Sequence, residues 1–236
     1  MKRRRLGQHY LIDGEVIRKV VSQAGIGPSE RVLEIGTGRG ALTKELAGLG
    51  ASYVGYEVDS ANFTETSRLL GGRDARVVLA DAFEQHPDFD VLVSSLPYSE
   101  SSSFIRWLSG MEFRRAVVVL QEDFVSKITA PPGSREYRGI SALSQICFDI
   151  RVLERVPRAA FSPQPRVGSV IASFTPRHRI DDVEVSSIIR LFSLRRRLAE
   201  SALSELGMKH EGSFQRRRVN SLIPDEVHLL CAPKHP

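Results

Sequence analysis

The sequence predicts an α/β protein with a mostly parallel, doubly wound sheet, an antiparallel hairpin and a small C-terminal helical domain. Short apolar segments alternate with amphipathic ones along the first half of the chain, as in repeated strand–helix units. The apolar segment Arg31–Ile35 leads directly into a glycine turn at residues 36–40, which is typical of a ligand-binding strand–turn–helix unit. The strands expected at residues 152–156 and 167–174 are too close in sequence for a crossover helix, so they should form a hairpin.

The first elements of the chain lie on either side of the glycine turn. Residues 6–12 form an extended lead-in. Asp13 is a favourable N-cap residue, and apolar residues recur at helical spacing from there to Gly25, which should end the helix. Further helices are expected at residues 41–49 (ended by Gly50), 60–70, 104–108 and 143–148 and from Glu122, and further strands at 52–58, 76–80, 89–94 and 116–120.

The length of the chain, 236 residues, allows one full α/β core and a small additional module. We expect residues 1–176 to form the cofactor-binding domain and residues 177–236 to form a helical domain. In the second segment apolar residues recur at helical spacing, and Pro224 opens a last short helix. The loop at residues 130–139 is long and rich in proline and glycine, so we expect it to be mobile or to face a substrate.

The composition is that of a globular protein, with 42% hydrophobic residues. No apolar run approaches the roughly 20 residues that cross a bilayer, and no signal core follows the basic N-terminus, so we expect a cytoplasmic protein without membrane contact. The two cysteines, Cys147 and Cys231, lack metal-site spacing and predict reduced, buried thiols and no metal. No dimerisation stripe is evident, and we expect a monomer.

The positive charge of the chain is clustered. The formal net charge is +5 and the isoelectric point is about 9.5. Basic runs occur at residues 2–5, 114–115, 195–197 and 216–218. Such runs are commonly solvated faces, but four of them in one chain of this size indicate contact with a polyanion such as a nucleic acid.

The glycine turn fits two kinds of ligand. Gly36, Gly38 and Ala41 satisfy the dinucleotide pattern, which would indicate a nicotinamide enzyme. However, Glu34 directly precedes the turn, an arrangement common where the ligand is S-adenosylmethionine, whose amino-acid end is zwitterionic.

Acidic residues follow the next two strands. Glu57 and Asp59 end one strand, where a carboxylate could accept both ribose hydroxyls, and Asp81 ends another, where it could meet an adenine amine. Each acid could instead cap the helix that follows it. Three acids at successive strand ends beside a glycine turn favour a nucleoside pocket.

The segment Ser95-Leu96-Pro97-Tyr98 indicates the substrate. An exocyclic amine of adenine or cytosine is a poor nucleophile, so an enzyme that methylates it must align the nitrogen and polarise its hydrogens. A short polar side chain before a rigid proline turn offers acceptors at fixed positions, and the tyrosine offers a stacking face for an unstacked base. A packed tyrosine at a simple proline turn is the alternative.

Phe161 opens a second candidate wall of this site. Two prolines stiffen residues 161–167, so Phe161 could be held out as a platform for the base. A buried phenylalanine at the entrance of a hairpin is an equally good reading of the same segment.

Taken together, these segments resemble the KsgA family of ribosomal RNA adenine dimethyltransferases, in particular its archaeal-like members. The matching strings are Gly7-Gln-His-Tyr-Leu11, Glu34-Ile-Gly-Thr-Gly38, Glu57, Asp81-Ala82, Gln121-Glu-Asp-Phe-Val125, Pro132-Gly-Ser134, Tyr137 and Ala160-Phe-Ser-Pro-Gln-Pro-Arg-Val167. The resemblance implies a class I (Rossmann-like) methyltransferase fold with S-adenosylmethionine as cofactor. It also implies dimethylation of two neighbouring adenosines near the 3′ end of small-subunit ribosomal RNA, on a pre-ribosomal particle.

The resemblance also implies roles for individual residues. His9, Leu11, Glu34, Gly36 and Gly38 would line the methionine end of the cofactor. Glu57 would bind the ribose, and Asp81 and Ala82 the adenine. Ser95, Leu96 and Pro97 would orient the target amine, with Ser95 also at the cofactor, and Tyr98 and Phe161 would hold the flipped base.

Two positions depart from the pattern of the family. Ser95 replaces an asparagine, so a hydroxyl must act where a longer carboxamide usually does, which should slow the reaction without abolishing it. Gly168 replaces an aspartate, which suggests the loss of a contact that braces the loop. These departures motivate an alternative function, a ribosome-assembly factor of the same fold with weak or no methyltransferase activity. Large-subunit methyltransferases that confer antibiotic resistance, and more distantly a nicotinamide dehydrogenase, are further alternatives.

Overall fold

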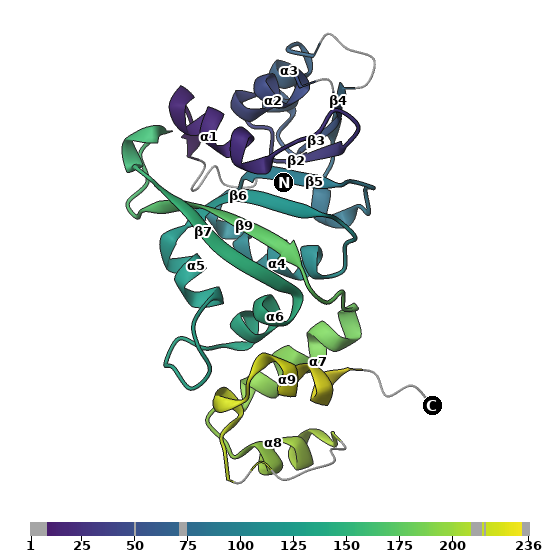
Figure 1. Cartoon of the computed structure of the whole chain (residues 1–236), viewed down its shortest axis with the longest axis vertical. Helices are drawn as coiled ribbons and strands as arrows, with labels where there is room; N and C mark the ends of the chain where they lie inside the picture. The colour runs from purple at the N-terminus through teal and green to yellow at the C-terminus, as the bar shows by residue number, and fades with distance from the viewer. Residues whose placement is uncertain (1–8, 50, 71–74, 209–213, 215, 233–236) are drawn as a thin grey trace. The chain divides into compact units, whose positions relative to one another are not determined.

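The computed structural model describes residues 9–49, 51–70, 75–208, 214 and 216–232 (Figure 1). The chain forms two compact units. Unit 1 comprises Met1–Phe104, Met111–Val125 and Ile150–Pro176, and unit 2 comprises Ile105–Gly110, Ser126–Asp149 and Arg177–Pro236. One boundary between the units falls after residue 176, but unit 2 also draws on two earlier segments, so the expected division of the chain into residues 1–176 and 177–236 stays a prediction, as does the assignment of separate tasks to them.

Unit 1 is built on a mixed 7-stranded sheet with the strand order β4-β3-β2-β5-β6-β9-β7 (Figure 1). The five strands from β4 to β6 pair in parallel, and β9 is antiparallel to β6, with Val119 opposite Ile171. The predicted α/β class is therefore confirmed. The strands are β2 (Arg31–Ile35), β3 (Ser52–Glu57), β4 (Ala75–Leu79), β5 (Val91–Ser95), β6 (Arg115–Gln121), β7 (Phe148–Val156) and β9 (Ser169–Pro176).

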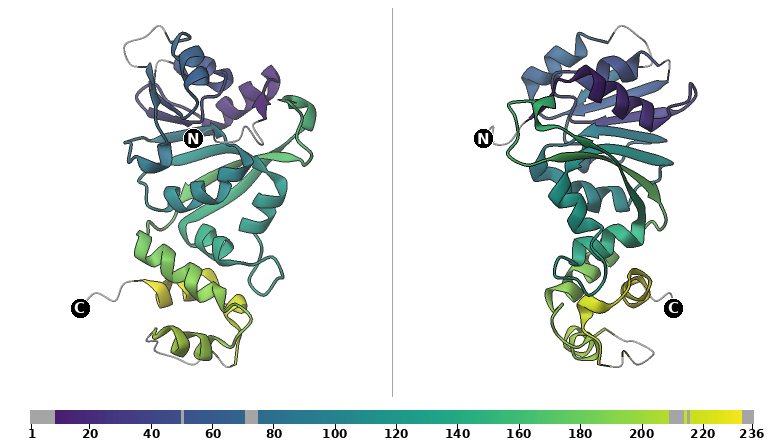
Figure 2. Two further views of the ribbon diagram at one scale, coloured as in Figure 1. Left: turned by 180° about the vertical axis from the view of Figure 1, so that it is seen from behind. Right: turned by 60° about the vertical axis from the view of Figure 1, so that its left-hand side comes forward.

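Helices follow the strands as the alternation predicts (Figure 2). Asp13 caps the first helix by accepting from the backbone N–H groups of Glu15 and Val16, and Gly25 ends it in the left-handed conformation with φ 56°. The helices are α1 (Gly14–Ala24), α2 (Ala41–Ala47), α3 (Ser60–Ser67), α4 (Ser101–Ser109), α5 (Glu122–Ile128), α6 (Gly139–Cys147), α7 (Asp182–Ser193), α8 (Ala199–Leu206) and α9 (Pro224–Cys231).

Several expected helix bounds differ from the structure, and three of the ends have a local cause. Helix α2 ends at Ala47 because Gly48 caps it, and the expected stop at Gly50 lies outside the described residues. Helix α3 ends at Ser67, where the chain tightens into a turn whose N–H groups bond three residues back. Helix α6 ends at Cys147, because Phe148 already belongs to β7.

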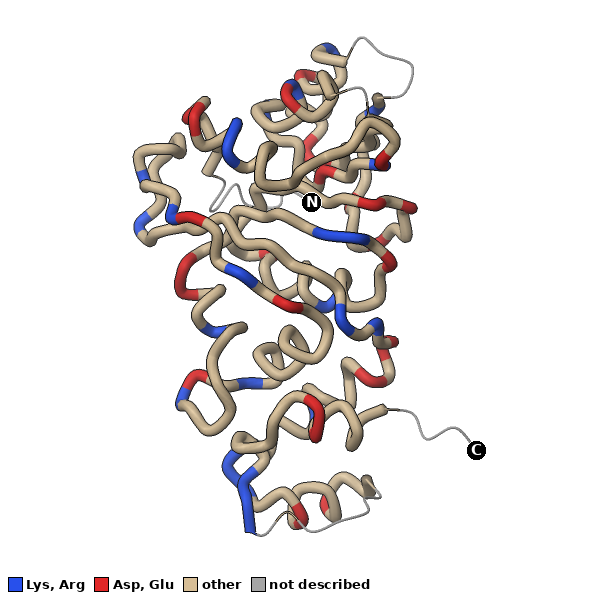
Figure 3. Tube along the Cα trace, in the orientation of Figure 1, with Lys and Arg blue, Asp and Glu red and all other residues tan. Residues whose placement is uncertain are grey.

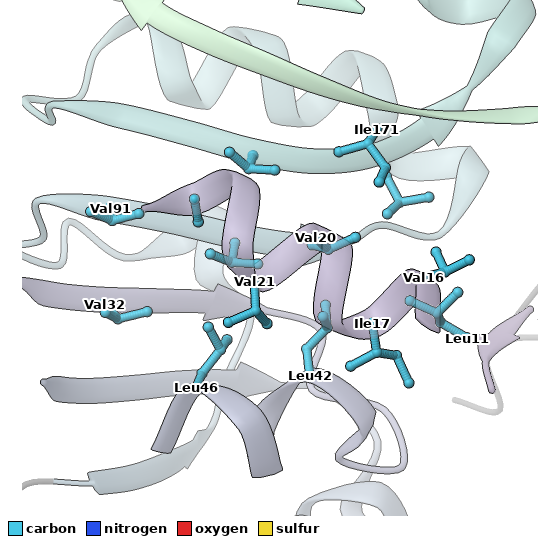
Figure 4. Packing of buried hydrophobic residues seen from close by; sticks show 14 of the residues in the cluster. Leu11, Val16, Ile17, Val20, Val21, Val32, Leu42, Leu46, Val91 and Ile171 are labelled. Atoms are coloured by element: carbon cyan, nitrogen blue, oxygen red, sulfur yellow. The ribbon is translucent and has the colours of Figure 1, made fainter. Parts of the chain in front are cut away.

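The core of unit 1 forms where α1 packs on the sheet and on α2 (Figure 4). Val20, Val21 and Ile17 reach from α1 toward Leu42 and Leu46 of α2 and toward the valines of the central strands. This burial of aliphatic side chains, each worth about 1.5–3 kcal/mol when complete, fixes the sheet beneath the glycine turn. The side-chain spacing that predicted α1 is therefore also what anchors it.

A small second sheet joins segments far apart in the sequence. Strand β1 (Tyr10–Leu11) pairs antiparallel with β8 (Phe161–Ser162), so Leu11 lies opposite Phe161. The N–H of Ile12 adds a bond of 2.8 Å to the carbonyl of Ala160. This pairing attaches the lead-in to the loop before β9, and nothing in the local sequence pattern indicated it.

Unit 2 is helical, with α6 packed against α7 and α9, and α8 packed against α7. Its buried side chains include Leu143, Ile188 and Leu203. The C-terminal helices predicted from apolar spacing and, for the last one, from Pro224 are confirmed. No helix in the described part of the chain is long and apolar enough to cross a membrane.

Candidate active site

A cavity of about 580 Å³ opens in unit 1 above the carboxyl ends of β2, β3 and β5. The chain reverses its direction of winding between β2 and β5, which is where open α/β sheets bind their ligands. The volume is that of a site for a small molecule or cofactor. Its walls contain all of the predicted cofactor residues: His9, Leu11, Glu34, Gly36, Gly38, Glu57, Asp81, Ala82 and Ser95.

The glycine turn forms the floor of this cavity. Gly38 has φ 53°, and a Cβ atom at that position would lie 3.3 Å from the ring of Tyr10. Gly40 has φ 78°, and a Cβ there would lie 2.3 Å from Leu69. The positive φ values favour glycine at both positions, and an added Cβ at position 40 would also have to displace the Leu69 side chain.

Glu57 braces this turn from the end of β3. Its Oε2 accepts from the backbone N–H of Gly38, and its Oε1 accepts from those of Val58 and Asp59, each at 2.8 Å. The side chain is 4% exposed and lines the cavity. A carboxylate offers about four acceptor positions, so at least one remains for a ligand hydroxyl.

The two aspartates at strand ends act at least in part as helix caps. Asp59 accepts from the N–H groups of Ala61 and Asn62 and so caps α3. Asp81 accepts from the N–H of Phe83 at 3.0 Å with one oxygen. Its other oxygen has no hydrogen-bond partner among the described residues, and Asp81 lines the cavity. Capping therefore uses one oxygen of each aspartate, and both side chains line the cavity, so each keeps an oxygen that could meet a ligand.

Glu34 is the most deeply buried acid of the site, with 1% exposure. Its Oε2 accepts from the hydroxyls of Tyr53 at 2.6 Å and Thr43 at 2.8 Å. Burial raises the pKa of Glu34 to about 8, although the two hydroxyls oppose this shift. Its hydrogen bonds therefore join β2, β3 and α2, while part of the side chain faces the cavity.

A smaller depression of about 10 Å³ lies beside the main cavity, and four residues line both: His9, Ser95, Leu96 and Pro97. Tyr98 completes it. The ring of His9 lies 5.3 Å from the ring of Tyr98, and its Nδ1 donates to the carbonyl of Pro163 at 2.7 Å. The Tyr98 hydroxyl bonds Ser169 Oγ at 2.7 Å. The structure thus brings the predicted amine-binding turn to the edge of the cofactor-sized cavity.

Phe161 is not held out as a platform. It is 3% exposed and belongs to the core, because the pairing of β1 with β8 packs it beside Leu11. Its ring forms part of the wall of the small depression, together with Val119. The second reading of this segment, a buried phenylalanine, therefore describes how the Phe161 side chain packs.

Gly168 is explained by its neighbour Glu122. A Cβ atom at position 168 would lie 2.9 Å from Glu122 Oε2, and the Glu122 carboxylate pairs with Arg155 at 2.9 Å. An aspartate at 168 would place a second negative charge against Glu122. With Gly168 in place of an aspartate, we expected the loop to lose a carboxylate. The Glu122 carboxylate at the start of α5 occupies that region instead.

Three residues that the sequence patterns did not single out contribute to the site. Ser169 is 1% exposed and holds the Tyr98 hydroxyl. Tyr53 bonds Glu34 from the neighbouring strand. Asn62 lines the cavity, and its Nδ2 is buried without a partner among the described residues. Asn62, close to Asp59 at the start of α3, and Ser169, directly after Gly168, lie close enough in sequence to recognised positions to have been suspected.

Arg115, in the basic run at residues 114–115, is bonded within the chain. Arg115 donates to Glu30 at 2.6 and 2.9 Å and to the carbonyl of Gly25, at the end of α1. The Arg115 guanidinium holds the pKa of Glu30 down at about 2. The run at residues 2–5 lies outside the described residues, as do Gly7 and Gln8. Among the described residues, no group of His, Cys, Asp and Glu side chains could hold a metal ion.

Comparison with known proteins agrees with this geometry. The profile of a family described as ribosomal RNA adenine dimethylase matches residues 1–223. A probable ribosomal RNA small subunit methyltransferase A of Pyrococcus abyssi is 33% identical over 237 residues, covering 94% of this chain and 88% of the relative. A dimethyladenosine transferase of Plasmodium falciparum has a similar fold, with a TM-score of 0.79, 23% identity and coverage of 94% and 96%. The 23S ribosomal RNA methyltransferase ErmE is also similar in fold, with a TM-score of 0.65, 23% identity and coverage of 95% and 100%.

Proposed function

The chain belongs to the ribosomal RNA adenine dimethylase family, and from this premise we propose that it dimethylates the exocyclic amines of two adjacent adenosines near the 3′ end of small-subunit ribosomal RNA. The methyl donor is S-adenosylmethionine, which supplies an electrophilic methyl group. One observation carries the proposal: the Ser95–Tyr98 turn borders both the cofactor-sized cavity and the small depression beside it. Methyl donor and target amine could therefore meet at this turn.

The donor set of the cavity fits this cofactor. Glu57 offers a carboxylate acceptor for the ribose hydroxyls, and the free oxygen of Asp81, beside Ala82, offers one for the adenine amine. The unpartnered Nδ2 of Asn62 adds a donor in the same wall. For the methionine end we assign the glycine turn with its preceding acid and the lead-in: Gly36, Gly38, Glu34, His9 and Leu11.

The residues of the turn at 95–98 would act on the target amine. The Ser95 hydroxyl and the carbonyls of Leu96 and Pro97 can accept its hydrogens, which orients the nitrogen toward the methyl group. The Tyr98 ring can stack on the base, an interaction worth about 1–3 kcal/mol, with Phe161 as the wall behind it. No side chain need act as a strong base, because the amine loses its proton readily once it is methylated.

The same proposal includes the cellular context. We assign the activity to the cytoplasm, to a monomer acting on a pre-ribosomal small subunit during ribosome biogenesis. The segment 177–236 would contact the RNA. The basic runs of this segment support that assignment.

The test is transfer of labelled methyl groups from S-adenosylmethionine to small subunits that lack the modification, followed by mass analysis of the RNA. We expect dimethyladenosine at two neighbouring positions. Cofactor binding without transfer would instead indicate an assembly factor, the function that the departure at Ser95 favours. A Ser95→Asn variant that restored transfer would then identify the cause.

A further inference from the structure

The charged side chains around the cavity of unit 1 are nearly all acidic. Five carboxyl groups line it, those of Glu34, Glu57, Asp59, Asp81 and Glu100. Among the described residues that line the cavity, Arg39 is the one lysine or arginine. Figure 3 marks the acidic residues of the chain in red and the basic ones in blue along the Cα trace. A ligand that carries a carboxylate is therefore repelled by most of the charges around this cavity and attracted by Arg39.

Arg39 belongs to the glycine turn and is held by an aromatic ring of the lead-in. Its guanidinium lies over the ring of Tyr10, with Cζ 4.6 Å from the ring centroid. Tyr10 is itself fixed, because its backbone pairs with Ser162 and its ring lies against the backbone of Gly38. An aromatic face attracts a guanidinium electrostatically and leaves its N–H groups available. The cation is thus placed at the cavity without using its hydrogen-bond donors.

The guanidinium of Arg39 has no carboxylate partner in the described part of the chain, although five carboxyl groups line the same cavity. The most deeply buried of these groups are engaged elsewhere. Both oxygens of Glu57 accept backbone N–H groups, and Glu34 accepts the hydroxyls of Tyr53 and Thr43. An arginine that faces several acids and pairs with none of them is available for an anion that enters with a ligand.

The methionine end of S-adenosylmethionine carries such an anion. This end is a zwitterion with an ammonium group and a carboxylate, whereas the ribose and adenine groups are uncharged. We assign the methionine end to the glycine turn and the lead-in, and Arg39 and Tyr10 come from these two segments. The acidic wall suits the ammonium group and the sulfonium, so the carboxylate is the part of the ligand that needs a cation.

From this distribution of charge we propose that the Arg39 side chain binds the carboxylate of S-adenosylmethionine and that Tyr10 positions the guanidinium for it. The inference rests on the cofactor of the proposed function and is independent of the RNA substrate. A guanidinium binds a carboxylate through two parallel N–H donors, which adds geometric selectivity to the attraction of opposite charges. Arg39 therefore selects ligands with a complete amino-acid end over ligands that lack the carboxylate.

Isothermal titration of the full chain with two ligands tests this selection. S-adenosylmethionine and its decarboxylated form share the adenosine, the sulfonium and the amine, and they differ only in the carboxylate. We expect Arg39→Gln to weaken binding of S-adenosylmethionine about fivefold to twentyfold, a loss between that of an exposed ion pair and that of a hydrogen bond to a charged group. Binding of the decarboxylated form should stay within about threefold of the wild type, so the preference for the carboxylate should shrink accordingly.

Matched variants separate carboxylate binding from a general effect of charge. Lys44→Gln removes the same charge from an exposed position of α2 that does not line the cavity, and it should change neither affinity. Arg39→Lys keeps the charge without the paired donors, so it should restore part of the preference. Tyr10→Phe keeps the ring beneath the guanidinium and should behave as the wild type, whereas Tyr10→Leu should reduce the preference about twofold to fivefold.

The ratio of the two dissociation constants decides the outcome. An Arg39→Gln variant that kept the wild-type ratio would overturn the inference, and so would an equal loss of affinity for both ligands, which would indicate an altered turn. An unchanged ratio with weaker binding to small-subunit RNA would reassign Arg39 to an RNA phosphate. Because the Arg39 side chain is exposed, the melting temperature of the variant should match that of the wild type. A wild type that prefers the carboxylate but transfers no methyl group to RNA would overturn the proposed function and leave the role of Arg39 intact.

Discussion

Replacing Glu57 with glutamine tests the centre of the cofactor site. The carboxylate accepts three backbone N–H groups, from Gly38, Val58 and Asp59. A glutamine has nearly the same shape but only one acceptor oxygen. If that oxygen keeps the bonds to Val58 and Asp59, the amide NH₂ group faces the N–H of Gly38, and two donors oppose each other at the floor of the cavity.

The expected magnitude follows from this bonding pattern. A hydrogen bond to a charged acceptor contributes about 1.5–3 kcal/mol, and a change of 1.4 kcal/mol is tenfold in an equilibrium constant. The N–H of Gly38 belongs to the turn that should bind the cofactor, and Glu57 is also the proposed ribose acceptor. Glu57→Gln should therefore weaken binding of S-adenosylmethionine about tenfold to hundredfold.

Isothermal titration with S-adenosylhomocysteine, together with thermal unfolding, measures both effects. The matched control is Asp59→Asn, two residues away, whose amide oxygen can still accept from the N–H groups of Ala61 and Asn62. Asparagine is about as good an N-cap as aspartate, so this variant should bind the cofactor normally. If Glu57→Gln bound within about twofold of the wild type, both its brace of the turn and its role at the ribose would be refuted.

Further predictions concern Glu34, Ser169 and Ser95. The pKa of Glu34 is raised from 4.5 to about 8, so between these pH values the folded state keeps a proton that the unfolded state has released. The free energy of unfolding should therefore fall as the pH rises, by about 1.4 kcal/mol per pH unit and about 5 kcal/mol by pH 8. Glu34→Gln should remove this loss, as measured by urea unfolding at pH 5, 6.5 and 8, and parallel curves for the two proteins would contradict the assignment. Ser169→Ala removes the partner of the Tyr98 hydroxyl and should lower kcat/KM for RNA about twofold to tenfold without changing cofactor affinity. Tyr98→Phe should add nothing to the Ser169→Ala defect if the hydrogen bond is what matters. Ser95→Asn gives the acceptor a longer reach, so methyl transfer should be maintained or increased up to about tenfold, and a loss of transfer would argue against Ser95 as an amine acceptor.

Local patterns were sufficient to predict most of the fold. The cap at Asp13 and the stop at Gly25 were correct, because each depends on the backbone conformation of its own position and on nearby N–H groups. The strand that leads into the glycine turn was recognised from its own apolar residues and from the glycines that follow it. The proposed cofactor residues lie around one cavity. The sequence could predict this, because it predicted parallel strands, and parallel strands place their carboxyl ends at one edge of the sheet.

Contacts across long stretches of chain could not be predicted in this way. The pairing of Leu11 with Phe161 and the bond from Tyr98 to Ser169 each join residues more than 70 positions apart, and neither leaves a periodic signal. The burial of Phe161 is a consequence of the first contact. Backbone partners for a short strand such as β1 depend on the tertiary fold rather than on its own sequence.

The basic runs show why charge in the sequence is an incomplete guide to RNA contact. Arg115 is already matched by Glu30, and an RNA phosphate could recruit it only by breaking a hydrogen-bonded ion pair. Arg195 and Arg196 have no such pair among the described residues, so an anion could approach them without breaking an internal ion pair. The two runs look alike in the sequence, yet they differ in where the nearest carboxylates lie. The internal partners, which only the fold reveals, place Arg115 in the scaffold and leave Arg195 and Arg196 without an ion pair in the described part of the chain.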